Sequence, residues 1–236
     1  MWQMSPFQPQ IDDGYGWMAE SYKEAGDRVL DFPRPRQLVG IECPTCFLYR
    51  HSIELYLKSL IVVLHRTLEL PFGDVPHDAG PKVRCGDGWR PIYTVHRISD
   101  LYAHFRALIR ENKATLDANT RTDWSTIPEQ LDEWMTRAGE ADPGSTFFRY
   151  PVTSSHECDA LKSPWEELDS PEAILKVGLG QAPIHALLIL NEEEEIVRAY
   201  KCCHDVLGEL QSVLRQAAEA LSVVHFAIRA ELAGGW

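Results

Sequence analysis

The chain has 236 residues, of which 44% are hydrophobic and 25% are charged, and its formal net charge is −12 at pH 7. These fractions are ordinary for a globular protein and exclude a largely disordered or collagen-like chain. The acidic balance excludes a broad basic surface that binds duplex DNA nonspecifically, although it is compatible with a local cationic pocket.

The N-terminus and the cysteines indicate a compartment. MWQMSPFQPQ lacks the basic and apolar regions of a signal peptide, and no apolar run approaches the roughly 18 residues that span a membrane. The six cysteines of so long a chain are then expected to be reduced thiols. We therefore expect a cytoplasmic protein without a membrane partner.

The first predicted elements are a helix within residues 11–30 and a long central helix over about 44–69. DFPRPR ends the first of these, because proline interrupts helices. The central helix has apolar strips on two faces, which is typical of a helix packed inside a bundle or between subunits. The strips are Ile53, Leu57, Leu60, Leu64 and Leu68 on one face and Leu48, Leu55 and Val62 across from it.

Polar residues lie between these strips, namely Arg50, His51, Glu54 and Lys58. Arg50, Glu54 and Lys58 are four residues apart, so the carboxylate is bracketed by two cations. We expect Glu54 to be buried against one of them, either in a structural ladder of ion pairs or in a functional site. CPTC, which begins the helix, could bind zinc or form a redox pair, but buried small residues are the favoured interpretation.

Residues 70–94 are too long for an ordinary loop, and the β-prone runs KVRC and RPIYTV around GDG predict a small hairpin inserted there. A third helix follows from Thr94 or His96 to about Asn112. Thr126 and Glu129 form a predicted capping box that starts a short fourth helix. Residues 141–190 are expected to be irregular or a small β element, with FFRY strand-like.

The last predicted helix covers about 191–228, because apolar residues alternate steps of four and three from Ile196 to Ile228. Asn191 is its expected N-cap, and Glu192 to Glu195 would form an acidic first turn that the helix dipole favours. An acidic tail or a metal site is the alternative interpretation of that run.

Three segments, LYRHSIELYLK, VHRISDLY and FFRYP, resemble bacterial members of the HEPN superfamily (higher-eukaryote and prokaryote nucleotide-binding domains). The resemblance covers about Phe47 to Pro151 at the level of motifs. It implies an α-helical bundle, frequent dimerisation, and membership of a superfamily that contains metal-independent RNases and inactive binding proteins. We therefore expect an all-α fold and a single domain over 1–236, in which 70–94 and 141–190 are loops or insertions.

Many such RNases use an Arg-x4–6-His motif, in which histidine acts as an acid or base and arginine stabilises phosphate charge. The pattern occurs here about as often as chance allows, so the pattern alone does not identify a catalytic pair, and the context of each match must be considered. The candidate catalytic residues are Arg50, His51, Glu54, His96 and Arg149, with Arg198 and His204 as a fallback pair. An antiparallel turn after the central helix would, however, place His96 near His65 rather than near His51.

Two functions follow as expectations. The first is an RNA- or nucleotide-acting protein, such as a metal-independent endoribonuclease of a toxin or defence system, that needs no cofactor or metal. The second is a catalytically inactive helical module that binds another protein. The apolar surface of the two long helices also predicts a symmetric homodimer, with the candidate residues of both subunits in one cleft.

Overall fold

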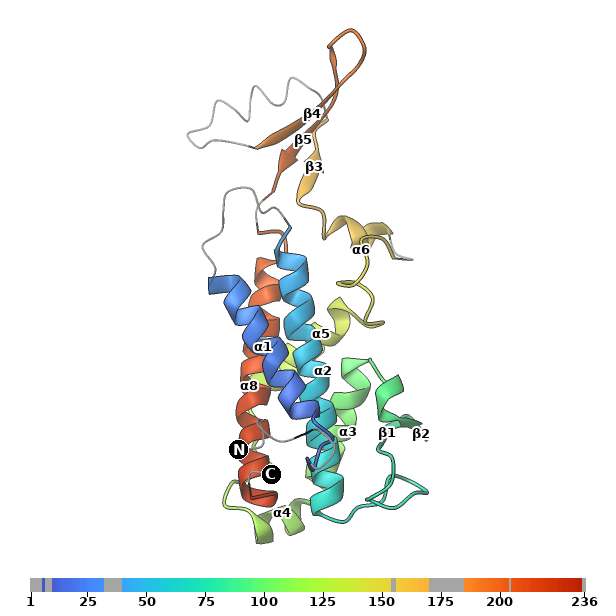
Figure 1. Cartoon of the computed structure of the whole chain (residues 1–236), viewed down its shortest axis with the longest axis vertical. Coiled ribbons are helices and arrows are strands. Elements are labelled where there is room, and N and C mark those ends of the chain that lie inside the picture. Colours follow the sequence, from blue (N-terminus) through green and yellow to red (C-terminus); the bar gives the residue numbers. More distant parts are fainter. Residues whose placement is uncertain are drawn as a thin grey trace.

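The computed structural model describes residues 6, 10–31, 40–153, 156–169, 185–203 and 205–234. Helices α1 (Tyr15–Asp31), α2 (Glu42–Thr67) and α8 (Gly208–Leu232) lie side by side along the long axis of the molecule (Figure 1). Helices α3 (Ile98–Glu111) and α5 (Glu129–Ala141) pack on each other, α3 against α2 and α5 against α8. None of the helices in these ranges is long and apolar enough to cross a membrane.

Helix α2 is the centre of the bundle, as its two apolar strips predict. Every residue from Ser52 to His65 is buried, because α1, α3 and α8 cover the helix from different sides. The predicted bounds of about 44–69 are correct to within the usual uncertainty of helix ends. Since the chain itself covers these strips, α2 offers no apolar face to a second copy.

The other helices predicted in the first two thirds of the chain are confirmed as α1, α3 and α5. The capping box predicted for α5 is wrong. Thr126 donates its hydroxyl proton to the carbonyl of Asp123 at 2.9 Å, and no side chain caps the helix. Pro128 occupies the N-cap position in an extended conformation, so α5 begins two residues later than the box requires.

The predicted hairpin is present. Strands β1 (Lys82–Cys85) and β2 (Gly88–Pro91) pair antiparallel, and Gly86 in the turn has a φ of +57°, a conformation that glycine adopts at little cost. The short helix η2 (Ile92–Thr94) then leads to α3. Helices α4 (Lys113–Asn119) and α6 (His156–Ala160) are the remaining short helices of the described residues.

The prediction of an all-α fold is wrong, because the chain is mixed α/β. Strands β3 (Trp165–Glu167), β4 (Ala186–Leu190) and β5 (Ile196–Cys202) form an antiparallel sheet in the order β3-β5-β4 at one end of the bundle (Figure 1). The small β element expected within 141–190 is therefore correct for β3 and β4. FFRY instead lies in a turn, and residues 170–184 of this segment lie outside the described residues.

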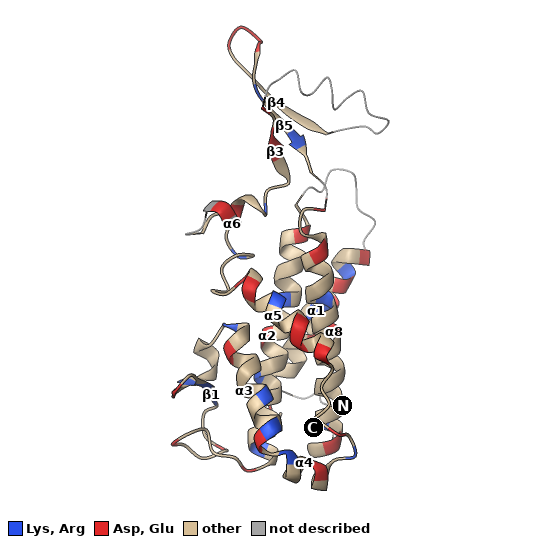
Figure 2. Ribbon diagram, turned by 180° about the vertical axis from the view of Figure 1, so that it is seen from behind, with Lys and Arg blue, Asp and Glu red and all other residues tan. Residues whose placement is uncertain are grey.

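The predicted helix 191–228 is wrong over residues 191–207. Asn191 does not cap a helix; its Oδ1 accepts hydrogen bonds from the backbone of Glu193 (3.1 Å) and Glu195 (2.8 Å) and closes the turn between β4 and β5. The acidic run is that turn, which Figure 2 shows at the tip of the sheet. Helix α8 begins at Gly208, and from there the seam is as predicted, with Leu214, Leu221 and Ile228 buried.

Candidate functional site

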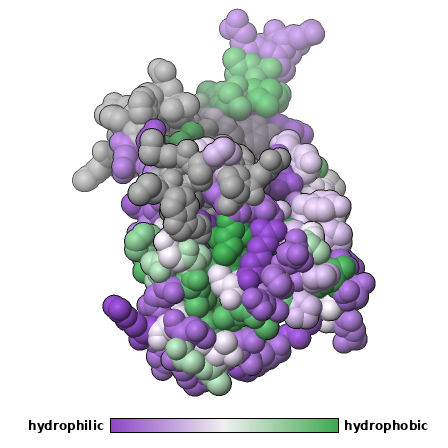
Figure 3. Space-filling view, turned by 60° about the horizontal axis from the view of Figure 1, so that its bottom comes forward, coloured by the Kyte–Doolittle hydropathy of each residue, from purple (hydrophilic) through white to green (hydrophobic). Residues whose placement is uncertain are grey.

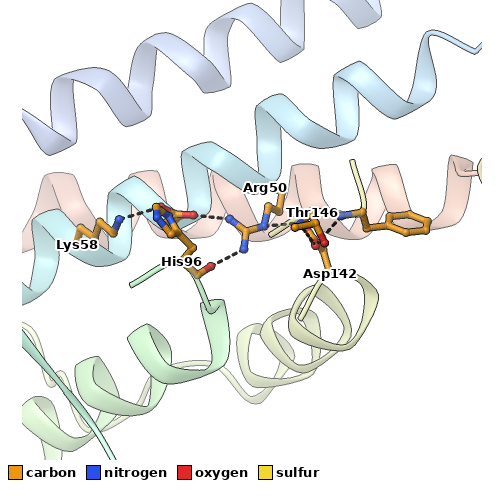
Figure 4. Close-up of polar contacts among 7 residues, drawn as sticks. Arg50, Lys58, His96, Asp142 and Thr146 are labelled. Carbon is orange, nitrogen blue, oxygen red and sulfur yellow. Dashed lines mark hydrogen bonds and ion pairs between the residues drawn. The ribbon is translucent and has the colours of Figure 1, made fainter. Parts of the chain in front are cut away.

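Glu54 lies at the centre of a buried ionic network on α2. Figure 4 shows Arg50, Lys58, His96 and Asp142 of this network. Its side chain is 1% exposed, and its Oε1 lies 2.8 Å from Nζ of Lys58. Arg50, one turn earlier, forms an ion pair with the other carboxylate oxygen. The burial of Glu54 against both neighbouring cations confirms the expectation from their spacing.

His96 joins this network from outside α2. Its Nδ1 lies 2.9 Å from Oε1 of Glu54, and its carbonyl oxygen accepts a hydrogen bond from Arg50. The β1-β2 hairpin and η2 account for this position, because they carry the chain back from the end of α2 before α3 begins. His96 therefore lies beside Glu54, and the histidine that contacts His65 is His104.

Asp142 completes the network, and the sequence analysis missed it. It follows the last residue of α5, and its Oδ2 lies 3.1 Å from Nε of Arg50. Its Oδ1 accepts hydrogen bonds from the backbone of Thr146 (2.8 Å) and Phe147 (3.0 Å). One signal could have found it, since two buried cations beside a single carboxylate require a second anion.

The charges of the network fix its protonation. Burial would raise the pKa of Glu54, but Lys58, Arg50 and the hydrogen bond from His96 lower it to about 2. Glu54 is therefore ionised at neutral pH and can only accept hydrogen bonds. It follows that Nδ1 of His96 donates to Glu54, which leaves Nε2 as the ring nitrogen that can exchange a proton with its surroundings.

The second nitrogen of His96 is accessible. The side chain is 43% exposed, and Nε2 is neither buried nor hydrogen-bonded to any described residue. A groove of about 600 Å³ lies between α3 and α5. Arg97 and Pro143, which follow His96 and Asp142 in the chain, line the groove together with Tyr102 and Met135.

His51 and Arg149 gather at a different point, the ring of Phe47. The His51 ring stacks on Phe47 with a centroid distance of 5.6 Å and meets the edge of Tyr22 at 4.5 Å. The guanidinium of Arg149 lies 5.7 Å from the Phe47 centroid. Burial lowers the pKa of His51 to about 4, so this histidine is a neutral packing residue at pH 7.

Arg149 also lines a cavity of about 480 Å³ between the start of α2 and residues 148–165. Lys162 lines the same cavity, but its ammonium pairs with Asp159 at 2.6 Å and donates to the carbonyls of Phe147 and Tyr150. Cys43, the first cysteine of CPTC, is half-buried there, while Cys46 is fully buried, as the favoured interpretation expected.

The structure does not place the fallback pair on a helix. Arg198 lies on β5 with its side chain 63% exposed, and its nearest acidic partner is Glu167 on β3 at 3.6 Å. His204 lies outside the described residues. The predicted placement of Arg198 on a helix is therefore wrong, because residues 196–202 form a strand.

A second buried polar cluster, formed by Asp12, Ser59, His225 and Arg229, was also missed. Oγ of Ser59 lies 2.8 Å from Nε2 of His225, and Asp12 lies 3.0 Å from Arg229. Although serine, histidine and aspartate form hydrolase triads, here Ser59 and Asp12 approach the same ring nitrogen and all are at most 3% exposed. The cluster therefore connects α1, α2 and α8 and is closed to a substrate.

Comparisons with protein-family models, with curated proteins and with solved structures found no match for this chain.

Proposed function

We propose that this chain acts on RNA or a nucleotide as a metal-independent ribonuclease, with His96 as its acid–base residue. One observation carries the proposal. An ionised, buried carboxylate holds Nδ1 of a half-exposed imidazole and leaves Nε2 as the nitrogen that can exchange a proton with a substrate. A carboxylate that orients a histidine in this way is a recurrent arrangement in acid–base catalysis.

The chemistry that fits one such histidine is cleavage by the neighbouring 2′-hydroxyl. His96 Nε2 accepts the hydroxyl proton while the 2′-oxygen attacks the adjacent phosphorus and the bond from phosphorus to the 5′-oxygen breaks. The leaving 5′-oxygen takes up a proton, which the imidazolium can return. The products are a 2′,3′-cyclic phosphate and a 5′-hydroxyl, and no water is consumed.

Arg50 has no part in binding the phosphate in this proposal. Its guanidinium is fully buried and engaged by Glu54, the carbonyl of His96 and Asp142. Arg97 is exposed, lines the groove between α3 and α5, and is better placed to meet an anionic substrate. Arg50, Lys58 and Glu54 are therefore positioning residues for His96.

The test uses His96→Asn, because the asparagine amide can still donate to Glu54 but has no acid–base nitrogen. Wild type, His96→Asn and the exposed control Arg198→Ala are purified identically and incubated with single-stranded RNA in excess chelator. We expect cleavage by wild type and Arg198→Ala, with a loss on the order of 10²–10⁴-fold in His96→Asn. Mass spectrometry should find 2′,3′-cyclic phosphate ends.

A second candidate is the catalytically inactive module that binds another protein. The observation that favours it is the complete burial of Arg50. A buried ion-pair network can serve to hold the helices together without any role in catalysis. Intact RNA with wild type, or equal cleavage by wild type and His96→Asn, would decide for this alternative and against the ribonuclease.

A further inference from the structure

Strand β4 is an apolar strand at an edge of its sheet. The strand order β3-β5-β4 leaves one side of β4 without a partner strand among the described residues. Its side chains Leu187, Leu188, Ile189 and Leu190 are between 41% and 51% exposed. Because successive residues of a strand point to opposite faces, both faces of β4 are apolar. Figure 3 shows this hydrophobic patch at the top of the view, below the hydrophilic tip.

The hydrogen-bond register shows which backbone groups of β4 face the open edge. The amide of Cys202 donates to the carbonyl of His185 at 2.8 Å, so this pair is hydrogen-bonded. Bonded pairs alternate along an antiparallel ladder, and Leu187 with Tyr200 and Ile189 with Arg198 are therefore the next ones. The N–H and C=O of Leu188, which lies between them, point away from β5.

The two edges of the sheet differ in charge. The β3 edge carries Glu166 and Glu167, and charged residues are a common protection of exposed edges against pairing. The β4 edge, ALLIL, has no charge and no proline. A strand with free backbone groups and apolar faces binds best to another strand of the same character.

We propose that β4 pairs with β4 of a second copy of this chain, antiparallel across a two-fold axis, to form one continuous six-stranded sheet. The acidic turn after Leu190 selects the direction. Parallel pairing would bring the turns with Glu192 to Glu195 of both copies together, whereas antiparallel pairing places them at opposite ends of the strands. Five residues at about 3.3 Å each separate them by roughly 17 Å, about twice the screening length of roughly 8 Å at physiological ionic strength.

This interface differs from the one that the sequence suggested. The α2 surface that motivated a homodimer is buried within one chain, whereas the side chains of Leu187 to Leu190 on β4 and of Ile196 and Val197 on β5 are exposed. Each copy also carries a net charge of −12, so added salt should strengthen the association by screening the repulsion.

The first test is Leu188→Pro with Leu188→Ala as its matched control. Proline removes the outward N–H and leaves the bonded pairs of Leu187 and Ile189 intact, whereas alanine removes the side chain and keeps the N–H. By light scattering over a range of protein concentrations, we expect a dimer for wild type and a monomer for Leu188→Pro. Leu188→Ala should dimerise, at a higher concentration. Unchanged helical circular dichroism in each variant shows that the bundle is folded.

Amide hydrogen exchange of the wild-type protein provides a readout that does not depend on a variant. The amide of Leu188 should become protected as the concentration rises, while those of Leu187 and Ile189 are protected throughout. A wild type that is monomeric at every concentration, or a Leu188→Pro variant that dimerises like wild type, would overturn the proposal. So would protection of the Leu188 amide in a monomer, since the chain itself would then cover the edge.

Discussion

Nδ1 of His96 lies 2.9 Å from Oε1 of Glu54, and this contact joins residues that are 42 positions apart. It connects the middle of α2 to the segment that precedes α3. Arg50 strengthens the same junction, because it binds the other oxygen of Glu54 and the carbonyl of His96. The start of α3, the groove beside it and the exposed Nε2 of His96 are thus all positioned by Glu54.

Glu54→Ala should destabilise the protein by roughly 3–5 kcal/mol, because removal of one partner from a buried ion pair leaves the other charge uncompensated. Lys58 is 3% exposed, and Glu54 is its ion-pair partner. The free energy of unfolding from urea titration measures the effect. The double variant Glu54→Ala/Lys58→Met should recover part of the loss, and a Glu54→Ala protein as stable as the parent would contradict the prediction.

Arg50→Lys should also be destabilising, by about 3 kcal/mol, although it conserves the charge. The guanidinium reaches Glu54, Asp142 and the carbonyl of His96 with different nitrogens, and a single ammonium cannot reach all three. The exposed Arg198→Lys is the control and should change stability by less than about 0.5 kcal/mol. Equal urea midpoints for the two variants would show that the forked geometry of Arg50 is unimportant.

Two glycines in helices should respond to alanine in opposite ways. A Cβ at Gly16 would overlap the ring of His225 and lie 2.8 Å from Oδ2 of Asp12, so Gly16→Ala should cost about 1–3 kcal/mol. A Cβ at Gly139 would have its nearest neighbour at 3.8 Å, so Gly139→Ala should stabilise α5 by up to about 1 kcal/mol. Thermal unfolding distinguishes them, and a stabilised Gly16→Ala protein would contradict the close packing at His225.

The sequence predicted the parts of the fold that depend on local periodicity. The two apolar strips of α2 and the four-residue spacing of Arg50, Glu54 and Lys58 predicted a buried helix with a buried ion pair, and both are observed. The helix predicted over residues 196–202 is wrong because a three–four spacing of apolar residues is also compatible with an amphipathic strand when the pattern is short. Pairing with the apolar β4 then decided the structure, and the local pattern does not contain that pairing.

The site was predictable only in part, because its partners come from distant segments. Glu54 and His96 were candidates from motifs, but their contact depends on how the hairpin returns the chain to α2. Asp142 and Asp12 each follow or precede a helix and carry no periodic signal, so only the three-dimensional arrangement identifies them as partners of Arg50 and Arg229.

A buried histidine pair should make the fold sensitive to acid. Nδ1 of His104 accepts the amide proton of Arg84 at 3.2 Å, and Nδ1 of His65 lies 3.0 Å from the carbonyl of Leu70. His65 therefore donates from Nδ1, and its Nε2 accepts from Nε2 of His104 at 3.4 Å. Both rings are neutral in this arrangement, and a proton added to either would break it.

The pKa shifts give the direction of this dependence. Burial lowers the pKa of His104 to about 3, with the neighbouring His65 and Arg84 acting in the same direction, and burial also lowers the pKa of His65. Below the ordinary histidine pKa of about 6.5, His104 binds a proton in the unfolded chain but stays neutral in the folded protein. The free energy of unfolding is therefore fully present above pH 6.5 and falls as the pH is lowered to about 3. His104 alone should remove about 2 kcal/mol of unfolding free energy between pH 6.5 and 5. Urea titrations across this range should show a shallower pH dependence for His104→Leu than for wild type, whatever the stability of the variant at pH 7, and parallel curves would show that the pair does not titrate on unfolding.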